Sequence, residues 1–221
     1  MLTVHHLEKS RSHRVLWLLE ELGLEYALKT YQRHPRTFLA PAELKAVHPL
    51  GKSPVITRDD MTLAESGAIL EWLTETYPDA ELAVAAADPA RPDYLYWLHY
   101  AEGTLMPLLV MTLVFRRVPK SRMPFFAKPV AKSITRRVIG SYIQPQVDTQ
   151  LRVLDDHLQR NTWLVANRFT CADIQISYPL EAAAGRYGLG EQYPALTAYL
   201  QRLRERPACQ RAIDKGGPVT L

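Results

Sequence analysis

Cysteine and long apolar runs are both scarce in this chain of 221 residues. Cys171 and Cys209 are the only cysteines, too few for the disulfide framework of a small secreted protein. Charged residues interrupt each apolar stretch before it reaches the ~18 residues that suggest a membrane span. The N-terminal sequence MLTVHHLEKSRSHR has neither the apolar centre nor the cleavage site of a signal peptide. We therefore expect a cytoplasmic protein with no membrane partner.

Several well-defined functional motifs are missing as well. There is no GxGxxG after the first expected strand, no GxxxxGK[ST] phosphate loop and no GxSxG nucleophile elbow. His5 and His6 are adjacent on an expected strand, so their side chains point to opposite faces and cannot bind one metal together. No Cys or His pair has the spacing of a zinc site. We expect no metal.

Acidic residues are missing from one long segment. Between Glu102 and Asp148 there are eight basic residues and no acidic one, and the chain's net charge of +4 depends on them. The commonest role of such a run is a solvated face, and the second possibility is the rim of a pocket for an anion. Nucleic acid is not expected, because no binding motif accompanies the charge. The basic residues are Arg116, Arg117, Lys120, Arg122, Lys128, Lys132, Arg136 and Arg137.

With 47% apolar and 23% charged residues, the chain can form a buried core, and its length suggests two small domains. Hydrophobic periodicity changes repeatedly over residues 1–78, which predicts a parallel βαβ unit, a short helix, a β-hairpin and a helix. The expected elements are strands at 2–7, 24–28, 53–57 and 61–64 and helices at 15–22, 42–47 and 67–77.

Helical patterns replace strand patterns after residue 78. Residues 79–92 are rich in Ala, Asp and Pro and read as a linker, and residues 93–221 read as an all-helical domain. A long helix at 93–115 should kink at Pro107. Thr170 and Asp173 have capping-box spacing, and a last helix at 196–203 should end at Pro207.

The first domain has the outline of a thioredoxin-like fold without a CxxC motif. The expected fold class is therefore α/β plus all-α, a thioredoxin-like N-terminal domain followed by a helical bundle. Because the helix after the first strand begins Ser10-Arg11-Ser12-His13, the protein supplies no dithiol of its own. Any sulfur chemistry must use a sulfur atom from a ligand.

Four separated segments resemble the soluble glutathione transferases over nearly the full chain, most closely bacterial and fungal members with a serine-type loop before the first helix. They are SRSHRVLWLLEELGLEY from Ser10, HPLGKSPVI from His48, LAESGAILEWL from Leu63 and FTCADI from Phe169. The resemblance implies glutathione as co-substrate, a homodimer with Tyr94, Trp97 and Met111 near the two-fold axis, and a role in detoxification. The aromatic residues among them are equally well explained by packing within one chain.

The residue types suit glutathione, which carries carboxylates at both ends and a thiol between them. Glu65 can bind the ammonium, and Ser66 with the helix N-terminus can bind the α-carboxylate, although both residues could simply cap the helix. The resemblance implies a cis bond before Pro54, which exposes the Ser53 backbone to glutathione. Lys52 would then pair with the glycine carboxylate, or it is a solvated loop lysine.

The sequence does not decide which residue activates the thiol: the candidates are two serines and their charged neighbours. We expect Ser10 to contact the sulfur and Ser12 to cap the first helix, because Ser12 adjoins its apolar period. The reverse assignment is nearly as good, and Arg11 or Lys9 could add to the serine or replace it. A charge-assisted hydrogen bond would lower the thiol pKa by roughly 1–2 units.

The predicted reaction is attack of the glutathione thiolate on a small hydrophobic electrophile, by conjugation or by thiol-dependent reduction. The rival hypothesis is a glutathione-binding regulatory or assembly module without turnover. An isomerase such as maleylacetoacetate isomerase is a third possibility, but its serine–serine–cysteine loop does not match Ser10-Arg11-Ser12. Candidate residues for the electrophile pocket are Met106, Val110, Phe115, Met123 and Phe126, each of which could equally be a core residue.

Overall fold

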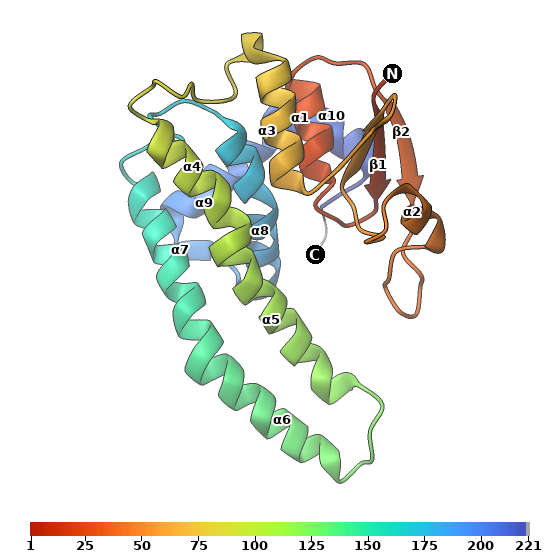
Figure 1. The fold of residues 1–221 in the computed structure, drawn as a ribbon. Helices are drawn as coiled ribbons and strands as arrows, with labels where there is room; N and C mark the ends of the chain where they lie inside the picture. Colours follow the sequence, from red (N-terminus) through yellow and green to blue (C-terminus); the bar gives the residue numbers. More distant parts are fainter. Residues whose placement is uncertain (220–221) are drawn as a thin grey trace.

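The computed structural model describes residues 1–219 and has the predicted fold class: a small sheet domain beside a larger helical one (Figure 1). The sheet order is β2-β1-β3-β4, with β1 (Thr3–Leu7) parallel to β2 (Ala27–Tyr31) and antiparallel to β3 (Val55–Arg58). β3 pairs with β4 (Met61–Ala64) as an antiparallel hairpin. The predicted βαβ unit and hairpin are both confirmed.

β2 begins three residues later than the alternating pattern at 24–28 predicted. Helix α1 (His13–Glu21) is followed by Gly23 at φ +64°, and the backbone N–H of Leu24 still bonds to the Leu19 carbonyl. Leu24 and Tyr26 pack against the core from this connection, so their alternation reflects a buried loop.

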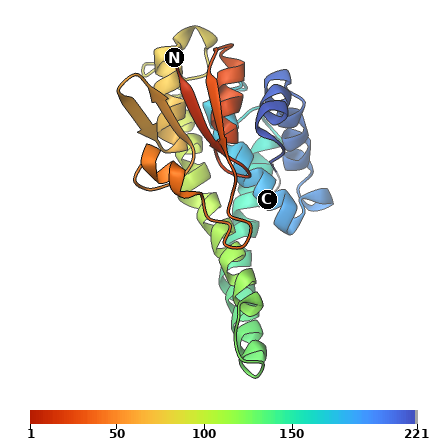
Figure 2. The ribbon, with the colours of Figure 1, turned by 90° about the vertical axis from the view of Figure 1, so that its right-hand side faces the viewer.

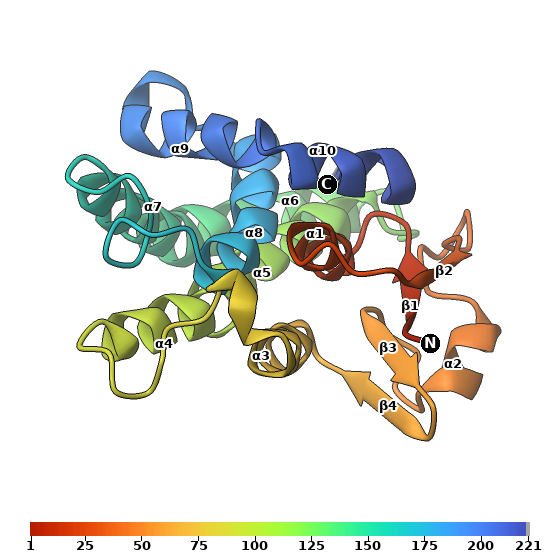
Figure 3. The same ribbon diagram turned by 90° about the horizontal axis from the view of Figure 1, so that it is seen from above.

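Helices cover both faces of the sheet (Figure 3). α1 and α3 (Ser66–Thr76) lie between the sheet and the helical domain, where their buried Leu and Ile side chains join the main core. On the other face, the short helix α2 (Ala42–Val47) packs Leu44 against Leu7 and Tyr31.

The helical domain contains more helix than the sequence indicated. The predicted last helix corresponds to α9, but Pro207 begins a further helix, α10, because proline is well suited to the first turn. α10 packs against α1. The basic segment holds the unpredicted α6. The long helices are α4 (Arg91–Tyr100), α5 (Met106–Arg117), α6 (Ala127–Val138), α7 (Gln144–Leu158), α8 (Cys171–Tyr187), α9 (Pro194–Arg204) and α10 (Pro207–Gly216).

α5 and α6 form a long hairpin that extends away from the body (Figure 2). Between α4 and α5 lies a π-helical turn, Ala101–Leu105, immediately before the predicted kink at Pro107, whose missing N–H interrupts the helical hydrogen bonding. Within residues 1–219, Arg91–Lys120 is the one helical stretch long and apolar enough, by length and composition alone, to cross a membrane. Its Tyr94, Leu105 and Leu109 side chains are buried in the core.

Candidate active site

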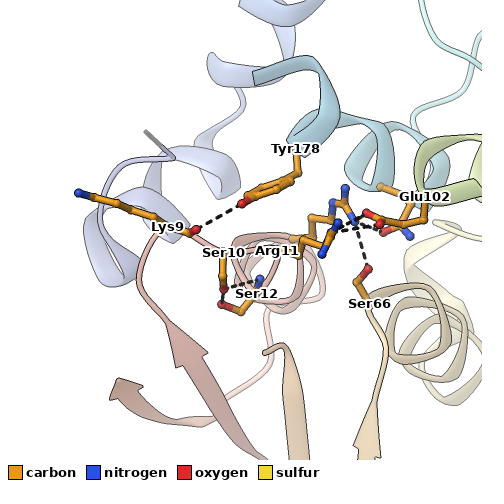
Figure 4. Close-up of polar contacts among 9 residues, drawn as sticks. Lys9, Ser10, Arg11, Ser12, Ser66, Glu102 and Tyr178 are labelled. Atoms are coloured by element: carbon orange, nitrogen blue, oxygen red, sulfur yellow. Dashed lines mark hydrogen bonds and ion pairs between the residues drawn. The ribbon is translucent and has the colours of Figure 1, made fainter. Parts of the chain in front are cut away.

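A chain of hydrogen bonds lies behind the loop that leads into α1. The Ser10 and Ser12 Oγ atoms are 2.7 Å apart, Ser12 Oγ is 2.8 Å from His6 Nδ1, and His6 Nε2 is 2.8 Å from the Gly216 carbonyl oxygen. Ser12 is fully buried and Ser10 is 6% exposed. Figure 4 shows the two serine hydroxyls directed toward each other.

The partners of this chain fix the direction of its hydrogen bonds. Because a carbonyl oxygen only accepts, His6 Nε2 carries a proton and donates it to Gly216. Burial lowers the pKa of His6, so the neutral ring predominates and Nδ1 is an acceptor. Ser12 then donates to His6, and Ser10 donates to Ser12. The single hydroxyl proton of Ser10 is therefore directed into the protein.

The expected capping role of the Ser12 side chain is wrong. Ser12 occupies the N-cap position of α1, but its hydroxyl makes no cap hydrogen bond. His6, on the adjacent β1, is a stronger competitor for that hydroxyl in the protein interior. The Ser12 main chain, in contrast, stabilises the start of α1. Its carbonyl accepts hydrogen bonds from the N–H groups of Val15 and Leu16, and its own N–H donates to Ser10 Oγ.

A polar pocket of about 90 Å³ brings together most of the predicted glutathione contacts. The Ser53–Pro54 peptide bond is cis, as expected. Ser53 Oγ donates to the His5 carbonyl and accepts from the Leu7 N–H, so its side chain is held by β1. The pocket is lined by Arg11, His48, Leu50, Lys52, Ser53, Pro54, Ala64, Glu65, Ser66 and Glu102.

Glu65 and Ser66 hold different positions at the start of α3. Glu65 is exposed and has φ +75°, a conformation that is unfavourable for a residue with a side chain. Ser66 is buried, and its Oγ accepts a 3.1 Å hydrogen bond from Arg14. Neither side chain caps α3: that helix has no side-chain cap hydrogen bond.

Arg14 lies buried behind the pocket and forms an ion pair with Glu102, which lines the pocket and is partly exposed. Neither residue was predicted as a site residue. Arg14 has no exposed surface; its Nη1 lies 2.6 Å from Glu102 Oε1 and 3.1 Å from Gln175 Oε1. Glu102 also accepts from Arg11 Nε at 3.0 Å. Arg14 thus orders Ser66 and, through Glu102, Arg11. Figure 4 shows Arg11, Ser66 and Glu102 gathered together. One signal was present: Arg14 lies four residues before Leu18, on the buried face of α1.

A second cavity, of about 490 Å³, adjoins the first at Arg11 and runs beneath α5 and α8. Of the five candidate residues for the electrophile pocket, Met106 lines it, and the other four do not. Val110 and Phe126 are exposed on the hairpin instead. The cavity is lined by Lys9, Arg11, Arg33, Phe38, Met106, Leu113, Arg117, Tyr178 and Arg186. A larger cavity of about 720 Å³, near Arg91 and Arg168, holds none of the predicted site residues.

The two cysteines line neither the 90 Å³ pocket nor the 490 Å³ cavity, and they are poorly suited to react. Both are buried. Burial raises the pKa of Cys209 to about 12 and raises that of Cys171 as well. Within residues 1–219, no group of three or more His, Cys, Asp or Glu side chains is arranged to hold a metal ion.

A thioredoxin-like domain with a cis-proline beside a polar pocket and with only buried, unreactive cysteines is typical of proteins that bind a thiol ligand. Comparison with known proteins specifies the family. Residues 10–76 match the glutathione S-transferase N-terminal domain, and residues 142–207 match the C-terminal domain.

Full-length relatives agree with the domain matches. Glutathione S-transferase 3 of Schizosaccharomyces pombe is 32% identical over 100% of this chain and 90% of its own length. Glutathione S-transferase 1 of Saccharomyces cerevisiae is also 32% identical, over 97% of this chain and 95% of its own. The crystal structure of a glutathione S-transferase from Actinobacillus pleuropneumoniae is 34% identical, with a TM-score of 0.79 over 98% of this chain and 93% of that one. This chain belongs to the glutathione S-transferase family: it is an enzyme with glutathione as its co-substrate.

Proposed function

We propose that the enzyme forms the glutathione thiolate beside Arg11 and directs it at an electrophile in the 490 Å³ cavity. The supporting observation is that Arg11 is the one residue of the described chain that lines both this cavity and the polar pocket. A sulfur atom placed between peptide and electrophile must lie at that junction. A guanidinium there stabilises the thiolate by its charge, and the N-terminus of α1 adds to the effect.

The polar pocket suggests how the peptide lies. The γ-glutamyl end would meet Glu65 and Ser66 at the N-terminus of α3, and the glycine carboxylate would meet Lys52. Because the Ser53 hydroxyl is already bonded to β1, the main chain beside Pro54 is left to bind the peptide groups of glutathione.

Ser10, which the sequence predicted as the residue that contacts the sulfur, is not the main thiolate-stabilising group in this proposal. Its proton is directed at Ser12, so Ser10 presents a lone pair at its outer side. To donate to a thiolate, Ser10 would have to give up its bond to Ser12. Arg11 needs no such rearrangement, since Glu102 binds its Nε and leaves the two terminal nitrogens for the ligand.

Other aspects of the function remain proposals. We retain domain limits of 1–78 and 93–221 with a linker at 79–92, a cytoplasmic homodimer, a role in detoxification, and no nucleic-acid partner. Tyr94 and Trp97 are buried within their own chain, so the large aromatic side chain that α4 exposes to a second protomer is Tyr96, which is 53% exposed. Conjugation is the proposed reaction, with thiol-dependent reduction as its variant.

The test is the pKa of the bound glutathione thiol, measured by titration of thiolate ultraviolet absorbance. Arg11→Met should raise that pKa by about 1–2 units, the equivalent of one lost charge-assisted hydrogen bond. Arg11→Lys should restore part of the shift, and Ser10→Ala should change the pKa less than Arg11→Met does. Arg122→Met, which removes an exposed positive charge that lines neither cavity, is the control and should leave the pKa unchanged. A large shift in Ser10→Ala with none in Arg11→Met would assign the thiolate to the serine.

A further inference from the structure

We infer that the electrophile is an anion: an unsaturated or aromatic compound bearing a carboxylate or a group of similar charge. This inference names the substrate class of the site and rests on the proposed function, which places the electrophile in the 490 Å³ cavity. That volume is within the ~300–1,000 Å³ range of small-ligand pockets. The sequence predicted a hydrophobic electrophile. The cavity has apolar residues that suit such a compound, but its lining is also strongly basic.

Five of the nine lining residues are basic and none is acidic. They are Lys9, Arg11, Arg33, Arg117 and Arg186. Glu102 pairs with Arg11, and no other member of the group forms an ion pair within residues 1–219. The Glu8 carboxylate accepts a hydrogen bond from the Arg33 main-chain N–H and forms no ion pair with its guanidinium. Four of the five cations therefore line the cavity without an ion-pair partner among residues 1–219.

The arginines are held in place through neutral groups. The Arg33 guanidinium donates to the carbonyls of Glu8, Phe38 and Lys9. Arg186 Nη1 donates to the Leu109 carbonyl at 2.9 Å. Such contacts orient a guanidinium and leave its charge available to a ligand. Partial burial, with Arg116 and Arg117 nearby, lowers the pKa of Arg186, as expected where cations lie together without a counter-ion.

Apolar groups provide a place for the body of the substrate. Phe38, Met106 and Leu113 line the same cavity. The guanidinium of Arg117 lies over the Phe38 ring, 5.5 Å from its centroid. The Tyr178 hydroxyl donates to the Lys9 carbonyl, so the tyrosine contributes mainly its ring. A flat apolar ring with a negative group at its edge matches this arrangement.

Glutathione itself does not account for these charges. In the proposed pose its two carboxylates lie at Lys52 and at the start of α3, both in the polar pocket. Of the five cations, Arg11 alone also lines that pocket. Arg33, Arg117 and Arg186 belong to the electrophile side.

A chloronitrobenzoate illustrates the reaction. The thiolate sulfur attacks the ring carbon that bears chlorine, a C–S bond forms, and chloride leaves with the electron pair of the C–Cl bond. No oxidant or reductant is required. The carboxylate takes no part in the bond changes, so it is free to bind the arginines while the ring is oriented toward the sulfur.

Binding can be tested without thiol chemistry. Protein saturated with S-methylglutathione, which has no thiol, is titrated by calorimetry with nitrobenzoate and with the neutral nitrobenzamide. We expect nitrobenzoate to bind at least about tenfold more tightly, the factor provided by one charge-assisted hydrogen bond. Added salt should reduce that preference. Arg117→Met should reduce it severalfold, and Lys9→Met should do the same.

The matched control is Arg122→Met, an exposed arginine five residues beyond Arg117 that lines neither cavity. It should keep the wild-type preference. Equal binding of the two probes, or a preference that survives both Arg117→Met and Lys9→Met, would overturn the inference. Preferential nitrobenzoate binding without turnover of chloronitrobenzoate by the glutathione-loaded enzyme would support the substrate class and contradict the proposed thiolate chemistry, so the two failures are distinguishable.

Discussion

Glu65 carries its side chain at a backbone position that favours glycine, since its φ is +75°. Such a conformation costs on the order of 1 kcal/mol and persists where the surroundings or the function require it. Glu65→Gly should therefore raise the free energy of unfolding by up to about 1 kcal/mol and weaken glutathione binding at least about tenfold. Chemical denaturation and calorimetry measure the two effects.

Glu65→Gln separates these effects, because it keeps the backbone cost and removes the charge. It should lose glutathione affinity with no gain in stability. If Glu65→Gly binds glutathione like the wild type, then Glu65 has no role in the ligand site.

His13 makes the folded state sensitive to acid. Its ring is buried with Nε2 unpartnered, and burial, with a smaller effect of His6 and Arg14, lowers its pKa from 6.5 to about 4. The unfolded chain therefore binds the proton more readily than the folded one. The contribution of neutral His13 to the free energy of unfolding is fully present above pH 6.5. It is lost as the pH drops from 6.5 toward 4, and the total loss is about 3 kcal/mol.

Chemical denaturation at a series of pH values tests this direction. The lowered pKa values of His5 and His6 act in the same sense. His13→Phe should flatten the fall in stability between about pH 6.5 and pH 4 relative to the wild type. An unchanged slope would show that His13 titrates normally.

Local sequence predicted the residues that line the polar pocket better than the residues that support them. Pro54 lies in one short motif and Glu65 and Ser66 in another, and the structure brings all three to one pocket. Arg14 and Glu102 are 88 residues apart, and each looks like an ordinary charge in its own helix. Their pairing depends on how the two domains pack, which no local pattern contains.

At the scale of elements, the predictions succeeded where local periodicity and burial agree. The βαβ unit, the hairpin and the helix at 42–47 lie where expected. The strand predicted at 24–28 begins only at Ala27, because the alternating apolar residues Leu24 and Tyr26 lie in a loop and pack against the main core. α6 was missed although its sequence is amphipathic. Its apolar residues Val130 and Ile134 are exposed on the hairpin, and Thr135 is its one buried residue.

The start of α8 is the element-scale feature with the largest expected effect on stability. Thr170 and Asp173 form the predicted capping box. Asp173 is fully buried and also accepts from the Leu164 N–H at 3.1 Å and the Tyr199 hydroxyl at 2.7 Å. Asp173→Ala removes the acceptor from four buried donors, the Leu164 N–H, the Tyr199 hydroxyl and both the N–H and the hydroxyl of Thr170, and we expect a loss of at least about 3 kcal/mol. Thr170→Ala removes one cap bond and should cost about 1 kcal/mol.

Thermal and denaturant unfolding of both variants provides the measurement, with Glu181→Ala as a control. Glu181 lies later in α8, in an ion pair with the partly exposed Arg204, so its removal should cost about 1 kcal/mol or less. Equal losses in Asp173→Ala and Glu181→Ala would contradict a special role for the capping box.

At the scale of the whole molecule, one fully buried charge, that of Arg14, has partners in both domains. Arg14 belongs to α1 of the sheet domain, and its partners include Ser66 from α3, Glu102 from the turn between α4 and α5, and Gln175 from α8. The 490 Å³ cavity likewise takes residues from both domains. Domain packing and site geometry are therefore set by the same contacts.

Arg14→Met tests this coupling directly. It leaves the partly exposed Glu102 with Arg11 as its remaining partner and removes the buried donor of Ser66 and Gln175, so the free energy of unfolding should fall by about 1–3 kcal/mol. The KM for glutathione should also rise, because Ser66 loses the donor that orients it and Arg11 loses a fixed Glu102. Adding Glu102→Gln to Arg14→Met should recover part of the stability, since the carboxylate that lost Arg14 is then a neutral amide, without recovering the KM. A double variant no more stable than Arg14→Met would show that Arg14 acts by filling space, and an unchanged KM would show that the domain contact and the site are independent.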